Sequence, residues 1–77
     1  MKQQTKKIGD HLKEIREQSG ISQMELSFQT KISQQAISLW ERNERIPNIQ
    51  ACIALADYYN ISLDELVGRT YIPQPLK

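Results

Sequence analysis

Apolar residues near the start of the chain recur at helical intervals. Ile8, Leu12 and Ile15 are four and three positions apart, which places them along one face of a helix. Gly20 follows them, and glycine often ends a helix because it adopts a positive φ without steric cost. The pattern predicts a first helix that begins near Ile8 and ends before Gly20.

Two further helices are predicted in the middle of the chain. The segment Ser22-Gln23-Met24-Glu25 has the form of a capping box, in which a serine and a glutamate three residues later satisfy free N–H groups. Ser33 is a good N-cap for the next helix, whose Ile37 and Trp40 share one face. A second helix therefore opens at the capping box, and a third is expected over residues 33–43.

The remaining periodic segment follows the break at Pro47. Asn48 can cap a fourth helix, whose predicted inward stripe is Ile49, Cys52, Leu55, Ala56 and Tyr59. Ser62-Leu63-Asp64-Glu65 is a second capping box and opens a short fifth helix. No segment alternates as a strand would. The fold class is therefore predicted to be all-α, a compact bundle of five short helices.

Length and composition limit what this bundle can be. With 77 residues the chain allows one small domain, predicted over residues 8–68, with a flexible N-terminus over 1–7 and a tail or dimerisation arm over 69–77. The single cysteine excludes an internal disulfide and a four-ligand Cys/His zinc site. Because no membrane-length or signal-peptide apolar run occurs, a cytoplasmic protein without a membrane partner is expected.

The segment 22–41 carries the functional signal. It predicts two short helices joined by a tight turn around residues 30–32, which is the arrangement of a helix-turn-helix. In that motif the first helix lies across the DNA backbone, and the N-terminal turn of the second enters the major groove.

Four residues of the predicted third helix are candidates for reading bases. Gln34 and Gln35 follow the Ser33 cap, and a glutamine amide offers the donor and acceptor that match adenine N6 and N7. Such a pair discriminates between bases by roughly 1–3 kcal/mol. Ser38 and Leu39 lie one turn further along, where the leucine can touch a thymine methyl group.

Residues 8–67 resemble the lambda-repressor-like, or xenobiotic-response-element type, helix-turn-helix domain. The matching features are Ile8-Gly9 with Leu12, Ile15 and Arg16; Gly20-Ile21-Ser22-Gln23 with Glu25-Leu26; Ile32-Ser33 with Ala36-Ile37-Ser38; Trp40-Glu41; Pro47; and Ile61-Ser62-Leu63-Asp64-Glu65-Leu66. The resemblance implies five helices, of which the second and third form the DNA-reading unit.

The resemblance also implies roles for individual residues. It assigns base reading to Gln34, Gln35, Ser38 and Leu39, with Ser33 at the edge of this set, and phosphate contact to Gln23, Ser33, Arg42, Asn43 and Arg45. Arg16 and Glu41 match a structural ion pair between the first and third helices. Two positions depart from the family. Lys31 stands where glycine is frequent, and as a cation in the turn it is expected to face phosphate; Phe28 replaces a charged, exposed residue.

The net charge of +1, from ten basic and nine acidic residues, argues against a protein that binds DNA by bulk charge. Cations do gather near the predicted reading helix, at Lys31, Arg42 and Arg45, where only Glu44 opposes them. Most of the acids fall on other helices. We therefore expect one copy to bind weakly and two copies to be needed.

The leading hypothesis is a sequence-specific double-stranded DNA-binding transcriptional regulator, of the repressor kind. It would act as a homodimer on a two-fold symmetric operator with half-sites ~34 Å apart. The dimer surface is expected to use the fifth helix and the tail, through Val67, Tyr71, Ile72 and Leu76.

Two other classes of function were weighed against it. A protein-interaction module, for example an antitoxin-like partner, would use an apolar patch of Phe28 and Leu39. An enzyme has little support, because the chain has one His, one Cys and no motif that joins a nucleophile to a base. His11 is expected at the surface and Cys52 in the core. No metal, cofactor or small-molecule substrate is predicted.

Overall fold

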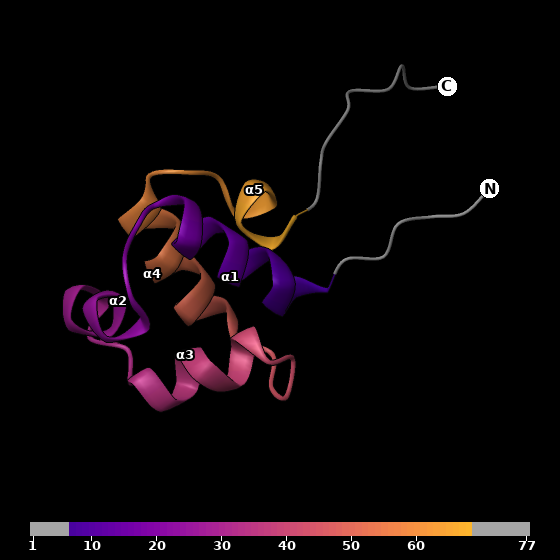
Figure 1. The fold of residues 1–77 in the computed structure, drawn as a ribbon. Coiled ribbons are helices and arrows are strands. Elements are labelled where there is room, and N and C mark those ends of the chain that lie inside the picture. The colour runs from indigo at the N-terminus through magenta and orange to yellow at the C-terminus, as the bar shows by residue number, and fades with distance from the viewer. Residues whose placement is uncertain (1–6, 69–77) are drawn as a thin grey trace, which may run out of the picture.

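The computed structural model describes residues 7–68 and contains five helices within that range (Figure 1). Their bounds are α1 Ile8–Gln18, α2 Gln23–Thr30, α3 Gln34–Glu41, α4 Ile49–Tyr59 and α5 Leu63–Val67. No strand occurs in this part of the chain. The predicted all-α fold class is confirmed.

Side-chain caps begin four of the five helices. The hydroxyls of Ser22, Ser33 and Ser62 each accept a hydrogen bond from the backbone N–H three residues later, at 3.0, 3.1 and 3.0 Å. The Asn48 amide oxygen does the same for α4 at 2.8 Å. Around Ser62 the box is complete, because Glu65 Oε1 accepts from the Ser62 N–H at 3.1 Å. The capping box predicted at Ser22 is incomplete, because only the hydrogen bond to the Ser22 hydroxyl is present.

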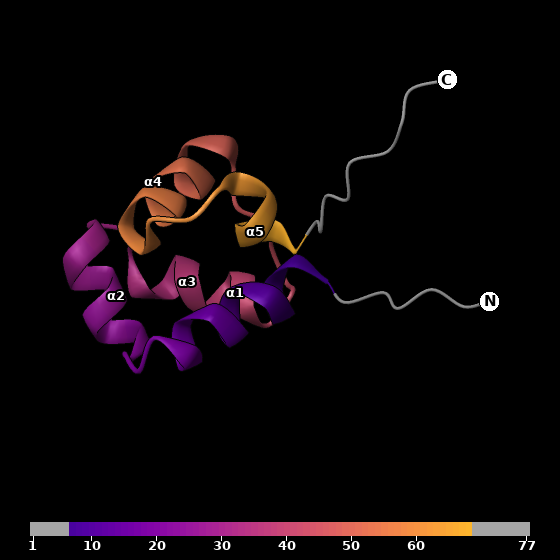
Figure 2. The same ribbon diagram turned by 90° about the horizontal axis from the view of Figure 1, so that it is seen from above.

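The core lies where the five helices meet. The helix α1 packs on α3 and α5, while α2 packs on α3 and α4, and α4 packs on α5 (Figure 2). The buried apolar residues are Leu12, Leu26, Ile37, Trp40, Cys52, Leu55, Ala56 and Leu66. Each helix contributes to this set, so no helix buries its apolar face alone.

Two residues lie elsewhere than the periodicity predicted. Ile49 was expected on the inward stripe of α4, yet it is 63% exposed because no neighbouring helix covers this first position. His11 was expected at the surface, yet its half-buried ring lies so close to Gly68 that a Cβ there would overlap it. The exposure of both side chains depends on contacts between helices, which the periodicity of the sequence does not report.

The start of α1 packs directly on the end of α3. Gly9 N–H donates to Asn43 Oδ1 at 2.9 Å, and Asn43 Nδ2 donates to Asp10 Oδ1 at 3.0 Å. Asn43 has a positive φ of 62°, and α3 ends at Glu41, two residues before the predicted limit at 43. Asn43 thus joins the loop after α3 to α1.

A buried ion pair joins the last turn of α1 to the last residue of α3. Arg16 Nε donates to Glu41 Oε2 at 2.7 Å, and Arg16 Nη2 donates to Glu41 Oε1 at 3.0 Å. The third guanidinium nitrogen, Nη1, donates to the Ile21 carbonyl at 2.8 Å. The Glu41 side chain is 3% exposed, and its hydrogen bonds raise the pKa of Arg16. This two-bonded geometry is the strong form of a carboxylate–guanidinium contact.

Replacing Gly9 by alanine is expected to destabilise the fold by about 1–3 kcal/mol, the usual cost of overpacking. A Cβ at Gly9 would overlap the Trp40 carbonyl oxygen and the Asn43 side chain, so α1 and α3 must separate. Urea unfolding measures the change, and Lys13→Ala on the exposed face of α1 is the control. Equal stability of Gly9→Ala and wild type would contradict the tight contact.

Removing Glu41 is expected to destabilise the protein by about 3–5 kcal/mol, because Arg16 is left as an unpaired, largely buried charge. The matched control is Glu44→Ala, which breaks the Arg42–Glu44 ion pair between side chains that are 54% and 55% exposed. Such surface pairs contribute little. Similar midpoints for Glu41→Ala and Glu44→Ala in urea would show that the buried pair has no special weight.

Candidate nucleic-acid interface

The turn between α2 and α3 is held by hydroxyl groups. Lys31 takes the left-handed conformation, with φ 66°, and its N–H donates to the Ser27 carbonyl at 2.8 Å. The Ser27 hydroxyl donates to the Ile32 carbonyl at 2.5 Å, and the Thr30 hydroxyl accepts from the Ile32 N–H at 3.3 Å. These bonds offset the cost, on the order of 1–2 kcal/mol, of a non-glycine residue in this conformation. They fix how α3 leaves the turn.

The first turn of α3 presents two amides that no protein group holds. Gln34 and Gln35 are exposed, and neither side chain makes a hydrogen bond within residues 7–68. The Ser33 hydroxyl, in contrast, accepts from the Ala36 N–H and is engaged as the helix cap. Each glutamine amide therefore keeps its donors and acceptor for an external partner.

The later part of the same face is partly engaged. Ser38 and Leu39 are half-buried, and Arg42 Nη1 donates to the Ser38 hydroxyl. Arg42 also pairs with Glu44, Nε to Oε2 at 3.1 Å and Nη2 to Oε1 at 3.2 Å. These hydrogen bonds raise the pKa of Arg42 and lower the pKa of Glu44. A phosphate that contacts Arg42 must compete with this carboxylate.

Two predicted phosphate contacts have structural partners that the sequence did not reveal. Gln23 is half-buried at the start of α2, and its Nε2 donates to Glu41 Oε1 at 2.9 Å. Asn43 uses both atoms of its amide toward α1. Each partner lies at least 18 positions away along the chain, so local spacing carried no signal for either bond.

Lys31 and Arg45 are the cations that remain available at the two ends of α3. Both are exposed, and neither forms an ion pair with another described residue. Arg45 borders a surface hollow of about 450 Å³ between the loop after α3 and the start of α1, whose other lining residues are Lys7, Ile8, Gly9, Asn43 and Ile46. Lys7 therefore adds a cation beside Arg45 that the predicted site omitted.

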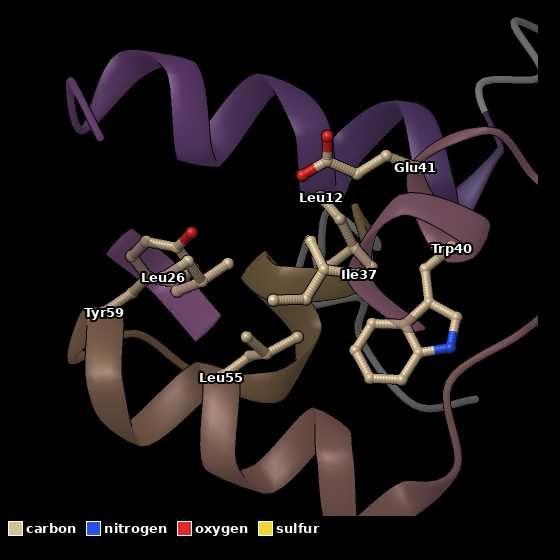
Figure 3. A pocket seen from close by; sticks show the side chains of 7 residues that line it. All are labelled: Leu12, Leu26, Ile37, Trp40, Glu41, Leu55 and Tyr59. Carbon is tan, nitrogen blue, oxygen red and sulfur yellow. The ribbon is translucent and has the colours of Figure 1, made fainter. Parts of the chain in front are cut away.

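Behind α3 lies a small, mostly apolar cavity. Figure 3 shows its lining, which comprises Leu12, Leu26, Ile37, Trp40, Glu41, Leu55 and Tyr59. Its volume of about 10 Å³ is near the minimum for one water molecule. The Tyr59 hydroxyl is buried and has no hydrogen-bond partner among residues 7–68, and burial raises its pKa to about 12.

The described residues also show what other kinds of site α1 to α5 offer. No group of three or more His, Cys, Asp or Glu side chains within 7–68 is arranged to hold a metal ion. The same part of the chain has no helix with the length and apolar character to cross a membrane. Cys52 is buried, and burial raises the pKa of its thiol.

Two curated proteins are similar to this chain in sequence. The HTH-type transcriptional regulator ImmR of Bacillus subtilis (strain 168) is 34% identical over 62 residues, which cover 80% of this chain and 49% of ImmR. The HTH-type transcriptional activator BcrR of Enterococcus faecalis is 26% identical over 61 residues, covering 79% of this chain and 30% of BcrR. The chain thus spans about half or less of the length of these relatives.

Two solved structures share the fold. The P22 c2 repressor, solved in complex with synthetic operator 9T in the presence of Tl⁺, superposes with a TM-score of 0.77 at 32% identity, covering 86% of this chain and all of that one. A transcriptional regulator from Listeria innocua superposes with a TM-score of 0.73 at 23% identity, covering 90% and 63%. This second likeness concerns the fold alone.

Residues 12–66 match the family described as helix-turn-helix. This match includes α2, α3 and the turn between them, and the superposition on the P22 c2 repressor covers 86% of the chain. The family resemblance of the sequence is confirmed. The chain belongs to the helix-turn-helix family.

Proposed function

We propose that residues 8–68 form a DNA-binding unit that reads double-stranded DNA in a sequence-specific way and represses transcription. The observation that carries this is the first turn of α3, where the Gln34 and Gln35 amides are exposed and have no partner among the described residues. The cations Lys31 and Arg45, which likewise form no ion pair within 7–68, lie at either end of the helix. The operator complex of the similar P22 c2 repressor supports DNA as the partner.

In this proposal α3 enters the major groove by its N-terminal turn. Gln34 and Gln35 bind base edges there, and adenine is their preferred partner because it offers a matching acceptor and donor. The Ser38 hydroxyl accepts from Arg42 and keeps its own O–H to donate to a base, while Leu39 adds apolar contact with a thymine methyl group. We therefore assign most of the base discrimination to the two glutamines.

Phosphate contacts fix the position of the domain on the duplex. Lys31 and Arg45 serve this role most directly, because no carboxylate among the described residues competes for them. Gln23 keeps one N–H beyond its bond to Glu41, at the helix end where backbone N–H groups favour anions. Arg42 and Asn43 contribute less, since their side chains already have protein partners.

So few free cations make the affinity of one copy low, because phosphate neutralisation supplies most of the binding at ordinary salt. We propose a homodimer on a two-fold symmetric operator, which doubles both the phosphate and the base contacts. Binding DNA requires no catalysis, cofactor or small molecule. We expect the protein in the cytoplasm, where such an operator is accessible.

A protein-binding role is the second candidate, and one observation favours it. Met24 and Phe28 are 67% and 76% exposed and lie one turn apart on the outer face of α2. Leu39, which the sequence analysis expected to join Phe28 in an apolar patch, is half-buried. The salt dependence of binding distinguishes the two functions. The logarithm of the DNA affinity must fall with the logarithm of the salt concentration, whereas the affinity for a protein partner on this apolar patch need not fall in that way.

Selection of bound duplexes from a random library is expected to yield a short, symmetric motif. The variant with Gln34→Ala and Gln35→Ala is expected to lose sequence preference, about 10-fold or more at each discriminated base, while its thermal midpoint stays near wild type. The controls are Gln18→Ala and Gln50→Ala, exposed glutamines on other helices. A selected motif unchanged in the α3 variant would contradict base reading by these amides.

Arg45→Ala is expected to weaken binding to all duplexes alike and to reduce the logarithmic salt slope by about 1, because one phosphate contact is lost. Arg42→Ala is the matched control: this arginine is also exposed and lies three residues away, but it is paired with Glu44. Its effect is expected to be smaller. A changed base preference in Arg45→Ala would instead place Arg45 at a base edge.

A further inference from the structure

The last turn of α3 closes in a way that fixes the position of Glu44. Asn43 takes the left-handed conformation, and its N–H donates to the Trp40 carbonyl at 2.9 Å. The Glu44 N–H donates to the Leu39 carbonyl, also at 2.9 Å. This pair of bonds is a common end of a helix, and it folds the chain back against the last turn. The backbone thereby holds Glu44 beside Arg42, the residue that caps α3.

Glu44 in turn holds Arg42 against Ser38. Arg42 Nε donates to Glu44 Oε2 at 3.1 Å and Nη2 donates to Oε1 at 3.2 Å, so the carboxylate binds one edge of the guanidinium. The remaining nitrogen, Nη1, donates to the Ser38 hydroxyl one turn earlier on α3. An ion pair between side chains that are 54% and 55% exposed adds little to stability. The pair instead determines the hydrogen bonding of Ser38.

The Ser38 hydroxyl is left as a hydrogen-bond donor. A serine hydroxyl has one donor and two acceptor sites, and Arg42 occupies an acceptor site here. Accepting from a cation also polarises the hydroxyl, which strengthens its O–H as a donor and weakens its second lone pair. In helices such an O–H often turns back to the carbonyl four residues earlier, as that of Thr30 does toward Leu26 at 2.7 Å. The Ser38 O–H makes no such bond among the described residues, so it is available to a base.

A donor at this position discriminates against one base. Ser38 lies one turn from Gln34, on the same face of α3. In the major groove guanine, adenine and thymine each present an acceptor, whereas cytosine presents only its N4 donor. A hydroxyl whose acceptor side is covered can bond to the first three bases, but it meets cytosine donor to donor. The cluster of Glu44, Arg42 and Ser38 is therefore suited to excluding cytosine.

We propose that Glu44 is a positioning residue that holds Arg42 on the Ser38 hydroxyl, so that Ser38 reads DNA as a donor and excludes cytosine. This inference rests on the proposed DNA-binding function and adds a specificity that the glutamines of α3 do not supply, because a glutamine amide both donates and accepts. The same contact keeps Arg42 from neutralising a phosphate. The cluster thus increases base discrimination and lowers non-specific affinity.

The cluster lies within a single copy of the domain, and its effect on base choice does not require a second copy. Of the dimer surface expected from the sequence, Val67 is half-buried, while Tyr71, Ile72 and Leu76 lie outside the described residues.

Selection of bound duplexes from a random library locates the base that Ser38 faces, because it is the position whose preference changes in Ser38→Ala. Wild type is expected to deplete cytosine there about 3- to 10-fold, the usual weight of one neutral hydrogen bond. Ser38→Ala is expected to lose the depletion, since no donor remains. Ser38→Thr keeps the hydroxyl and is expected to retain the depletion.

Glu44→Ala tests the positioning role. Without the carboxylate Arg42 is released from Ser38, so the depletion of cytosine is expected to disappear. Affinity for random DNA is expected to rise, and the logarithmic salt slope to steepen by about 1, as Arg42 neutralises a phosphate. Adding Arg42→Ala is expected to abolish this rise without restoring the depletion. The thermal midpoint is expected to stay near wild type, so a merely structural role would not produce these changes.

The matched control is Asp57→Ala, which removes the same charge from an exposed position on α4. It is expected to keep both the depletion of cytosine and the salt slope of wild type.

The outcomes separate the two proposals. If selection with wild type yields no motif, the proposed function fails, and the role of Glu44 fails with it. If a motif is found but cytosine is not depleted at the Ser38 position, or Ser38→Ala changes no position, only the role of the cluster is overturned. Depletion that survives in Glu44→Ala, or that is lost in Asp57→Ala, would likewise overturn Glu44 as the positioning residue.

Discussion

The buried carboxylate of Glu41 is the group on which the position of α3 depends. It accepts two hydrogen bonds from Arg16 of α1 and one from Gln23 of α2, so both helices that flank α3 are joined to it. Arg16 extends the network to the Ile21 carbonyl in the loop before α2. A charge that is 97% covered is stable only when its partners are complete, and this requirement determines the relative position of α1, α2 and α3. Removing one member leaves the others without compensation.

That network also explains how a domain with so thin a core can hold α3 firmly in place. The small cavity behind α3 shows that apolar packing alone does not fill the space between the helices. Directional hydrogen bonds from Glu41, together with the Asn43 amide between α3 and α1, restrict the rotations that loose packing would permit. Precise placement matters because base contacts depend on hydrogen-bond geometry.

The exposed polar groups of the domain divide into those with protein partners and those without. Arg42 is bound to Glu44 and Ser38, while Arg45, three positions later, has no ion pair among the described residues. The net charge of +1 does not show which of these arginines is paired. Phosphate contact depends on local, unpaired cations rather than on the total charge, which is why the proposed function relies on base contacts and on a second copy.

The helices could be predicted closely because their signals are local. A cap joins residues three apart, and an apolar stripe repeats every three or four positions, so the starts at Ser22, Ser33, Asn48 and Ser62 were readable from the chain. The end of α3 differs from the prediction. Asn43 takes the positive φ expected of a residue that ends a helix, but the helix has already ended at Glu41. Ile49 fits the stripe of α4 but is 63% exposed.

The sequence by itself therefore determined the number and type of the helices, the turn between α2 and α3 and, through the family resemblance, the pairing of Arg16 with Glu41. Only the tertiary structure decided which polar side chains remain free. Gln23 and Asn43 lost part of their capacity to partners 18 and 34 residues away, whereas Gln34 and Gln35 kept theirs. The physical reason is that a hydrogen bond depends on atoms within about 3 Å in space, whatever their separation along the chain.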